Sequence, residues 1–238
     1  MTERSGQIRE NFEKAGFSTT EEQEKQFVSY YRLLVETNKV MNLTASTEWE
    51  EVIKKHFLDS AMILRYMDLK EKKIIDVGTG AGFPGIPIKI LCPSIKLVLL
   101  DSLNKRISFL RKVTEELGLT DVETIHSRAE DAGRIPALRE QFDVSVSRAV
   151  ANLSTLSEYC LPFVKMGGYF ISYKSGKVEE ELLSAKKAFS ILCAVPEKVE
   201  RFTVPGTDWE RSLVFLLKEK NMSKRYPRKA GLPGKEPL

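Results

Sequence analysis

The segment that decides the fold is Asp76-Val77-Gly78-Thr79-Gly80-Ala81-Gly82-Phe83-Pro84-Gly85, which directly follows Ile74 and Ile75. Glycines remove side chains and adopt backbone conformations closed to other residues, so a ligand can approach the main chain. In open α/β sheets, ligands bind beyond the carboxyl ends of the strands. The segment therefore predicts a ligand-binding turn between a buried strand and a helix.

Short aliphatic runs alternate with amphipathic segments over residues 72–219. The runs lie at residues 72–78, 87–91, 96–101, 122–126, 142–149, 167–175 and 212–219, and helical segments are predicted at 104–117, near 153–164 and near 177–190. Aliphatic runs that are joined by helices are typical of a mainly parallel, doubly wound sheet with helices on both faces. We predict an α/β domain over residues 71–220.

The first 70 residues carry a different pattern. Helical spacing of apolar residues predicts helices at 20–37 and 48–67, the second with a capping box formed by Thr47 and Glu50. Residues 38–44 fit neither periodicity and are predicted to form a loop. We therefore expect residues 1–70 to form a helical extension packed on the α/β core.

The whole net charge of +4 lies in residues 221–238, which contain five basic side chains and one acidic side chain, together with several prolines and glycines. This composition predicts a basic, flexible tail that does not pack into the core. Its charge would attract phosphate whatever the nucleotide sequence, and Tyr226 is available to stack on a base. The alternative is a terminus that serves only solubility.

Composition also limits the compartment and the metal chemistry. The N-terminus has no apolar stretch of the kind found in signal peptides, and the chain has no apolar run approaching a membrane span, so a cytoplasmic location is expected. Cys92, Cys160 and Cys193 are isolated, which predicts neither disulfides nor a zinc site. The two histidines, His56 and His126, are too far apart in sequence to suggest a metal site.

Two classes of cofactor fit a glycine-rich turn at a strand end. Gly80, Gly82 and Gly85 match the G-x-G-x-x-G pattern of dinucleotide-binding proteins, with Asp101 at the distance of a ribose-binding acid. However, that motif begins directly at the strand end, and counted from Gly78 its third glycine would fall on a phenylalanine. The following proline also removes an amide that a pyrophosphate would bind. A nicotinamide oxidoreductase is therefore disfavoured.

S-adenosylmethionine carries an ammonium, a carboxylate and a sulfonium but no phosphate. Asp76, just before the glycines, suits the ammonium, and Asp101, at the end of the second run, can accept hydrogen bonds from both ribose hydroxyls. Backbone amides near Ala129 and Glu130 follow the third run and suit the adenine edge. Arg148 ends the fourth run, where substrate-facing residues are expected, and it cannot act as a general base.

Six motifs together resemble one family: DVGTGAGFPGIP (76–87), DSLNKRISFLR (101–111), SRAED (127–131), SRAVA (147–151), NLT (42–44) and HFLDS (56–60). The chain resembles the bacterial methyltransferases that modify guanine N7 in small-subunit (16S) ribosomal RNA, also called the glucose-inhibited division protein B family. The first motif is typical of class I methyltransferases in general, and HFLDS and DSLNKR narrow the resemblance to this family.

The resemblance implies a Rossmann-like class I methyltransferase fold with a seven-stranded sheet whose last strand is reversed, and S-adenosylmethionine as methyl donor. It also implies 16S ribosomal RNA or the small ribosomal subunit as partner, with no membrane and no obligate protein partner. The predicted cofactor-binding residues, from the resemblance and the turn together, are Asp76, Gly78, Gly80, Phe83, Asp101, Ala129, Glu130 and Arg148. The predicted substrate-positioning residues are Arg148, Lys174 and Arg128.

The chemistry expected of such an enzyme needs no catalytic acid or base, since guanine N7 has a lone pair and no proton to remove. Orientation alone can supply roughly 7–11 kcal/mol of barrier reduction. Neither a cysteine nucleophile nor an Asn-Pro-Pro-Tyr turn follows the fourth run, and Cys160 lies in a helical segment where a packed thiol is expected. His56 fits a packed core histidine or a residue that shapes the substrate pocket. Two alternatives stay open: a methyltransferase with another substrate, and a non-catalytic RNA-binding assembly factor.

Overall fold

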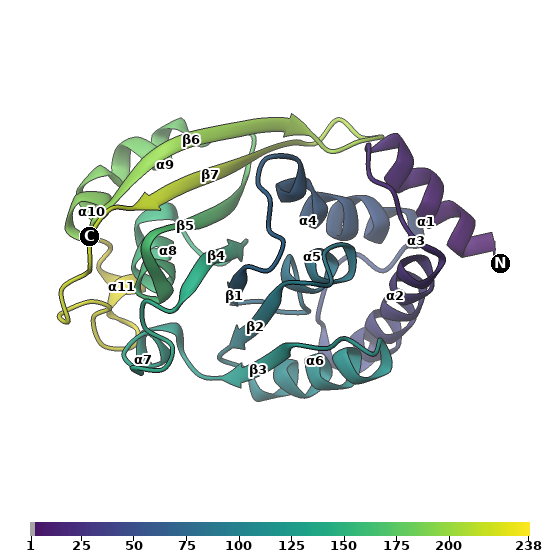
Figure 1. The fold of residues 1–238 in the computed structure, drawn as a ribbon, viewed down its shortest axis with the longest axis horizontal. Helices are drawn as coiled ribbons and strands as arrows, with labels where there is room; N and C mark the ends of the chain where they lie inside the picture. Colours follow the sequence, from purple (N-terminus) through teal and green to yellow (C-terminus); the bar gives the residue numbers. More distant parts are fainter. Residues whose placement is uncertain (1–2) are drawn as a thin grey trace.

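Seven strands form one sheet at the centre of the molecule, in the order β3-β2-β1-β4-β5-β7-β6. The structure is a computed structural model that describes residues 3–238 (Figure 1). The strands are β1 (Lys73–Val77), β2 (Lys96–Asp101), β3 (Val122–His126), β4 (Phe142–Arg148), β5 (Val164–Ser175), β6 (Ala194–Thr203) and β7 (Glu210–Lys218). β1 to β5 pair in parallel, and β7 runs antiparallel to both of its neighbours. The predicted fold class, with its reversed last strand, is confirmed.

Helices cover both faces of this sheet (Figure 1). They are α1 (Glu3–Lys14), α2 (Glu21–Met41), α3 (Trp49–Val52), η1 (Ile53–Leu58), α4 (Asp59–Ala61), η2 (Met62–Arg65), α5 (Gly85–Leu91), α6 (Asn104–Glu116), α7 (Ala129–Ala132), α8 (Leu153–Cys160), η3 (Leu161–Phe163), α9 (Glu179–Ser184), α10 (Lys186–Ile191) and α11 (Leu232–Lys235). Among residues 3–238, no helix combines the length and the apolar composition that a membrane span requires.

The side chains of each strand point alternately to the two faces of the sheet, and this divides the core into two apolar layers. Ile74 packs with the N-terminal helices, α5 and α6, whereas Ile75 packs with α8, η3 and α10 on the other face. Leu99 and Leu100 divide in the same way on the neighbouring strand. Successive side chains of a strand point to opposite faces, so a run that is apolar throughout fills both layers.

The N-terminal helices differ in detail from the prediction. The capping box predicted at Thr47 and Glu50 is wrong: Glu48 is the N-cap of α3 and makes no side-chain capping bond within residues 3–238, and the Ser46 hydroxyl donates to Glu51 instead. A capping box does occur where Thr20 begins α2. The predicted helix at 48–67 contains a π-helical turn, η1, of the kind often found at functional sites.

The C-terminal segment packs against the core, so the expectation that residues 221–238 stay off the core is wrong. Met222 and Pro233 are buried. Arg228 forms an ion pair with the fully buried Glu158 of α8. Arg139 donates to three main-chain carbonyls of the segment. The composition of the segment gave a wrong prediction because it counts charged residues without showing which groups they pair with. Here those groups, Glu158 and Arg139, lie far from the segment in sequence.

Candidate functional site

The glycine-rich turn between β1 and α5 forms the floor of a cleft at the carboxyl ends of the strands. Gly78 has a φ of +71°, and a Cβ on it would lie 2.7 Å from the Val150 side chain. Any other residue would therefore be strained and would close the cleft. The amide of Gly78 donates to the carbonyl of Leu100, which ties the turn to β2.

Asp76 is buried beneath this turn. Its Oδ2 accepts hydrogen bonds from the Thr79 hydroxyl at 2.7 Å and from the Gly85 amide at 2.8 Å, and Oδ1 has no hydrogen-bond partner in residues 3–238. Burial raises the pKa of Asp76 to about 7, although the two hydrogen bonds oppose this shift. Asp76 thus braces the turn, and its predicted contact with the ammonium of the cofactor stays a prediction.

Asp101, at the end of β2, faces the cleft, and its contact with the ribose of the cofactor stays a prediction. One carboxylate oxygen accepts from the amide of Gly80 at 2.9 Å, and the other accepts from the amide of Leu103. Arg106 forms an ion pair with the same carboxylate at 3.3 Å. The carboxylate is thereby fixed at the junction of two cavities, where it can also accept from the hydroxyls of a ribose.

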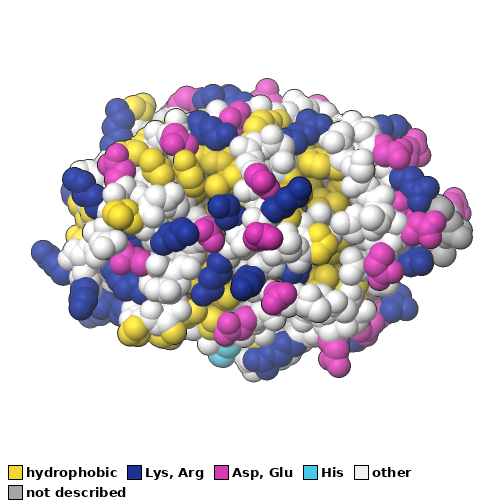
Figure 2. All heavy atoms as spheres, in the orientation of Figure 1, with side chains coloured by type: hydrophobic (Ala, Val, Ile, Leu, Met, Phe, Trp, Pro, Cys, Tyr) yellow, Lys and Arg dark blue, Asp and Glu magenta, His cyan; other side chains and the backbone are white. Residues whose placement is uncertain are grey.

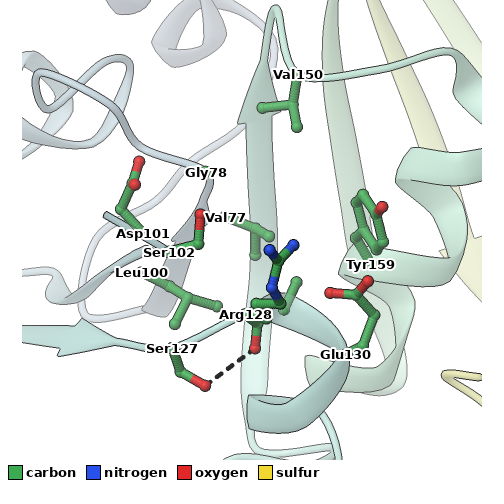
Figure 3. Close-up of a pocket in the computed structure, with 11 residues that line it drawn as sticks. Val77, Gly78, Leu100, Asp101, Ser102, Ser127, Arg128, Glu130, Val150 and Tyr159 are labelled. Carbon is green, nitrogen blue, oxygen red and sulfur yellow. Dashed lines mark hydrogen bonds between the residues drawn. The ribbon is translucent and has the colours of Figure 1, made fainter. Parts of the chain in front are cut away.

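The first cavity has a volume of about 210 Å³ and is shown in Figure 3. Asp101 and Ser102 lie on one side of it, and Glu130 and Tyr159 lie on the other, with the exposed Arg128 side chain between them. Ala129 and Glu130 begin α7, where a helix leaves its first amides without internal partners. This cavity offers an apolar slot with amide donors at one end, which suits an adenine ring.

The second cavity, of about 400 Å³, shares Gly78, Asp101, Ser102 and Val150 with the first, so the two form one cleft. It extends along Gly80 and Phe83 towards Arg148 and Thr44. A nucleoside in the first cavity would place an attached amino-acid chain in the second. The residues therefore fit S-adenosylmethionine, and Gly78, Gly80, Phe83, Asp101, Ala129, Glu130 and Arg148 all line the cleft.

Arg148 ends β4 and is held rigidly at the far end of the cleft. It donates to Asp59 at 2.8 Å and to His56 Nδ1 at 3.1 Å, and its guanidinium lies 5.1 Å from the centre of the Phe83 ring. A third bond goes to the main-chain carbonyl of Lys55. The side chain is only 14% exposed, so Arg148 organises the end of the cleft and is not free to follow a phosphate.

His56 is the residue that links Arg148 to the cleft wall. Its ring stacks on Phe83 at 4.5 Å, and burial, followed by the charge of Arg148, lowers the pKa of His56 to about 3. Arginine can only donate, so Nδ1 of the neutral ring accepts and Nε2–H donates to the Thr44 hydroxyl at 2.9 Å. His56 lines the cleft, which favours the expectation that it shapes the pocket.

Lys174, at the end of β5, is less available than the sequence suggested. Its ammonium pairs with Glu181 at 2.7 Å and donates to the carbonyl of Ala151, and the side chain is only 10% exposed. These contacts fix the loop after β4 against α9. A direct substrate contact by Lys174 stays a prediction, as does one by Arg128.

Sequence reasoning assigned no site role to three residues of this region: Thr44, Asp59 and Arg211. Asp59 follows His56 by three positions, so both side chains lie on one helical face and reach the same arginine. That spacing was a readable signal for a shared partner. The ion pair of Arg211 with Asp59, at 3.4 Å, joins β7 to η1 and α4, and no local pattern reports such a contact.

Comparison with known proteins agrees with this geometry. The sequence profile of the family described as GidB, rRNA small subunit methyltransferase G, matches residues 23–214. A ribosomal RNA small subunit methyltransferase G from Lactobacillus johnsonii is 50% identical over 228 residues, covering 94% of this chain and 95% of the relative. One from Clostridium novyi is 52% identical over 214 residues, covering 90% of this chain and 88% of the relative.

A solved structure supports the fold independently of sequence. A SAM-dependent methyltransferase from Aquifex aeolicus superposes with a TM-score of 0.52 at 18% identity, covering 70% of this chain and 93% of that one. The sheet order and the cleft at its carboxyl edge define a class I methyltransferase that uses S-adenosylmethionine. Within that class, the chain belongs to the rRNA small subunit methyltransferase G family. The resemblance drawn from the six motifs is thereby confirmed, together with the predicted cofactor.

Proposed function

We propose that this protein transfers the methyl group of S-adenosylmethionine to N7 of a guanine in 16S ribosomal RNA by direct in-line displacement. The observation that carries the proposal is the continuous cleft from Glu130 to Arg148, which ends in a neutral histidine and a fixed arginine. S-adenosylmethionine supplies an electrophilic methyl group on its sulfonium. Membership in the family supports ribosomal RNA as the acceptor.

The side chains around the end of the cleft suit an acceptor that loses no proton. His56 uses Nδ1 to accept from Arg148 and Nε2–H to donate to Thr44, so neither nitrogen is free to act as a base. Cys160 is buried, and burial raises the pKa of its thiol, which leaves it without nucleophilic character. Guanine N7 requires only that its lone pair be held in line with the methyl group.

The basic surface of the C-terminal segment suits a ribosomal RNA substrate. Figure 2 shows Lys and Arg side chains gathered at the end of the molecule where Figure 1 places the C-terminal segment, whereas the opposite end mixes both signs of charge. Lys224, Arg225, Lys229 and Lys235 of this segment are exposed. The amide of Arg228 donates to Glu158 of α8, and the amide of Gly231 donates to Glu130, which lines the first cavity, so the segment is fixed against the core and its exposed charges can attract phosphates. Bacterial ribosomal RNA as substrate would place the reaction in the cytoplasm.

The test is to incubate the protein with tritiated S-adenosylmethionine and small ribosomal subunits from cells that lack its gene, and then to identify the labelled nucleoside. We expect label in 7-methylguanosine only. Label in another nucleoside would contradict the acceptor, and binding of the cofactor without any label would favour the non-catalytic assembly factor.

A further inference from the structure

A third cavity, of about 370 Å³, opens on the other side of Arg148. It shares His56, Arg148 and Ala149 with the end of the cofactor cleft, so the two meet at the point where the methyl group would be presented. Its remaining walls come from η1 and α4, the end of β5 and the start of β7. It is large enough for a purine base together with part of its ribose.

Asp59 forms one wall of this cavity and is only 3% exposed. Its Oδ2 accepts from Arg148, but Oδ1 makes no hydrogen bond within residues 3–238. Arg211 Nε lies 3.4 Å from Oδ1 and forms an ion pair with it, without the geometry of a hydrogen bond. A buried carboxylate oxygen without a hydrogen bond is costly, so this oxygen is the natural acceptor for a ligand that brings N–H donors.

Arg148 offers the opposite kind of group to the same ligand. A guanidinium carries five N–H donors, and the contacts with Asp59, His56 and the carbonyl of Lys55 use three of them. The other two N–H groups of Arg148 make no hydrogen bond within residues 3–238. The cavity therefore presents an acceptor on Asp59 and adjacent donors on Arg148.

We propose that this third cavity holds the target guanosine, with Asp59 accepting from N1–H and N2–H of guanine and Arg148 donating to O6. Along one edge of guanine these groups follow in the order N2–H, N1–H and O6, which are two donors and one acceptor. N7 follows O6 around the ring, away from N1 and N2, so a base held in this way turns N7 from Asp59 towards the cofactor cleft. Adenine has an acceptor at N1 and an amino group in place of O6, so it would oppose both contacts.

This inference rests on the proposed function, because it names the site where the methyl acceptor of that reaction binds. The first experiment measures binding of GMP, IMP and AMP to the protein saturated with S-adenosylhomocysteine, by saturation-transfer NMR and titration. IMP retains N1–H and O6 but lacks the 2-amino group. We expect the affinity to fall in the order GMP, IMP, AMP, with GMP bound at least tenfold more tightly than AMP.

Asp59→Asn tests the role of the carboxylate. We expect the variant to lose the preference of GMP over IMP and AMP, whereas a residue that only supports Arg148 would weaken all three nucleotides to a similar extent. Thermal melting and cofactor titration establish that the variant is folded. Equal affinity of the wild type for GMP and AMP, including no binding of either, would overturn the assignment, as would an unchanged preference in Asp59→Asn.

Ser175→Trp tests the cavity itself without touching Asp59 or Arg148. Ser175 is exposed at the cavity rim, so an indole can occupy the space with little effect on folding. We expect methylation of the small subunit to fall at least tenfold with the Kd for S-adenosylmethionine unchanged. Ser108→Trp, at an exposed position of α6 that lines none of the three cavities, is the matched control.

The two proposals fail in different ways. Normal methylation by Ser175→Trp, while the wild type produces 7-methylguanosine, would overturn the third cavity as acceptor site and leave the proposed function intact. Absence of 7-methylguanosine with the wild type would overturn the proposed function, and the nucleotide preferences would still decide whether the cavity recognises guanine.

Discussion

The ion pair between Arg228 and Glu158 decides whether the C-terminal segment stays on the core. Glu158 has a side-chain exposure of 1%, and its two oxygens accept from Nε, Nη2 and the main-chain amide of Arg228 at 2.7–3.0 Å. Arg228→Met keeps the stem of the side chain and the main-chain amide but removes the guanidinium. Breaking one partner of a buried pair costs about 3–5 kcal/mol because the other charge is left uncompensated.

We therefore expect Arg228→Met to lower the free energy of unfolding, measured by urea denaturation, by about 3 kcal/mol or more. Arg225→Met is the matched control, since Arg225 is exposed in the same segment, and we expect it to change stability by less than about 0.5 kcal/mol. The double variant Arg228→Met/Glu158→Gln should recover part of the loss, because it removes the unpaired charge. A stability of Arg228→Met within 0.5 kcal/mol of the wild type would refute the reasoning.

Three further variants test the site and the C-terminal segment. His56 stays neutral in the folded protein with a pKa of about 3, against an ordinary value of 6.5, so the unfolded chain binds the extra proton first and stability is lost as the pH falls below 6.5. At pH 5.5 this loss is about 1.4 kcal/mol relative to pH 7.5, and it should be absent in His56→Gln. Burial raises the pKa of Asp76, which makes stability rise as the pH falls, and comparing urea unfolding of the two proteins cancels this effect because both contain Asp76. Equal pH slopes of the two proteins would contradict the assignment. Gly85→Ala would bring a Cβ within 2.8 Å of Asp76 Oδ2, so we expect the variant to be destabilised by about 1–3 kcal/mol. We also expect calorimetry to show weaker binding of the cofactor. A melting temperature equal to that of the wild type would be inconsistent with the contact. Lys224, Arg225 and Lys229 are exposed, and the third variant replaces all three by glutamine. In a plot of the logarithm of the RNA-binding constant against the logarithm of the salt concentration, we expect the slope to become less steep by about 0.7–0.9 for each phosphate contact that is lost. An unchanged slope would exclude contact of these residues with RNA.

The sheet and the cleft floor were predictable because local sequence determines them. Apolar runs that are buried on both faces predict parallel strands, and the glycine at position 78 is required by its own backbone angle and by the approach of Val150. Asp101 was placed correctly because the ends of neighbouring parallel strands meet at one edge of the sheet.

Long-range partners were beyond the reach of the sequence pattern. The C-terminal segment has the composition of a free tail, yet Glu158 and Arg139 supply buried partners that only the fold brings near. The same limit applies to the surroundings of Arg148, because no sequence pattern showed that Asp59 and His56 hold its guanidinium in place. Charge alone shows that a residue needs a partner, and the fold decides whether that partner is protein or ligand.

The central claim is that the cleft presents a methyl group to N7 of one guanine in the small-subunit RNA. Methylation at N7 places a positive charge on the imidazole ring, which makes the base removable by borohydride reduction and the chain cleavable by aniline. The most direct measurement therefore treats subunits from the gene-deleted strain with the protein and S-adenosylmethionine, applies this chemistry, and maps the break by primer extension. We predict one new stop at a single guanine, absent when S-adenosylhomocysteine replaces the donor; full incorporation of methyl groups without any aniline-dependent stop would contradict the account.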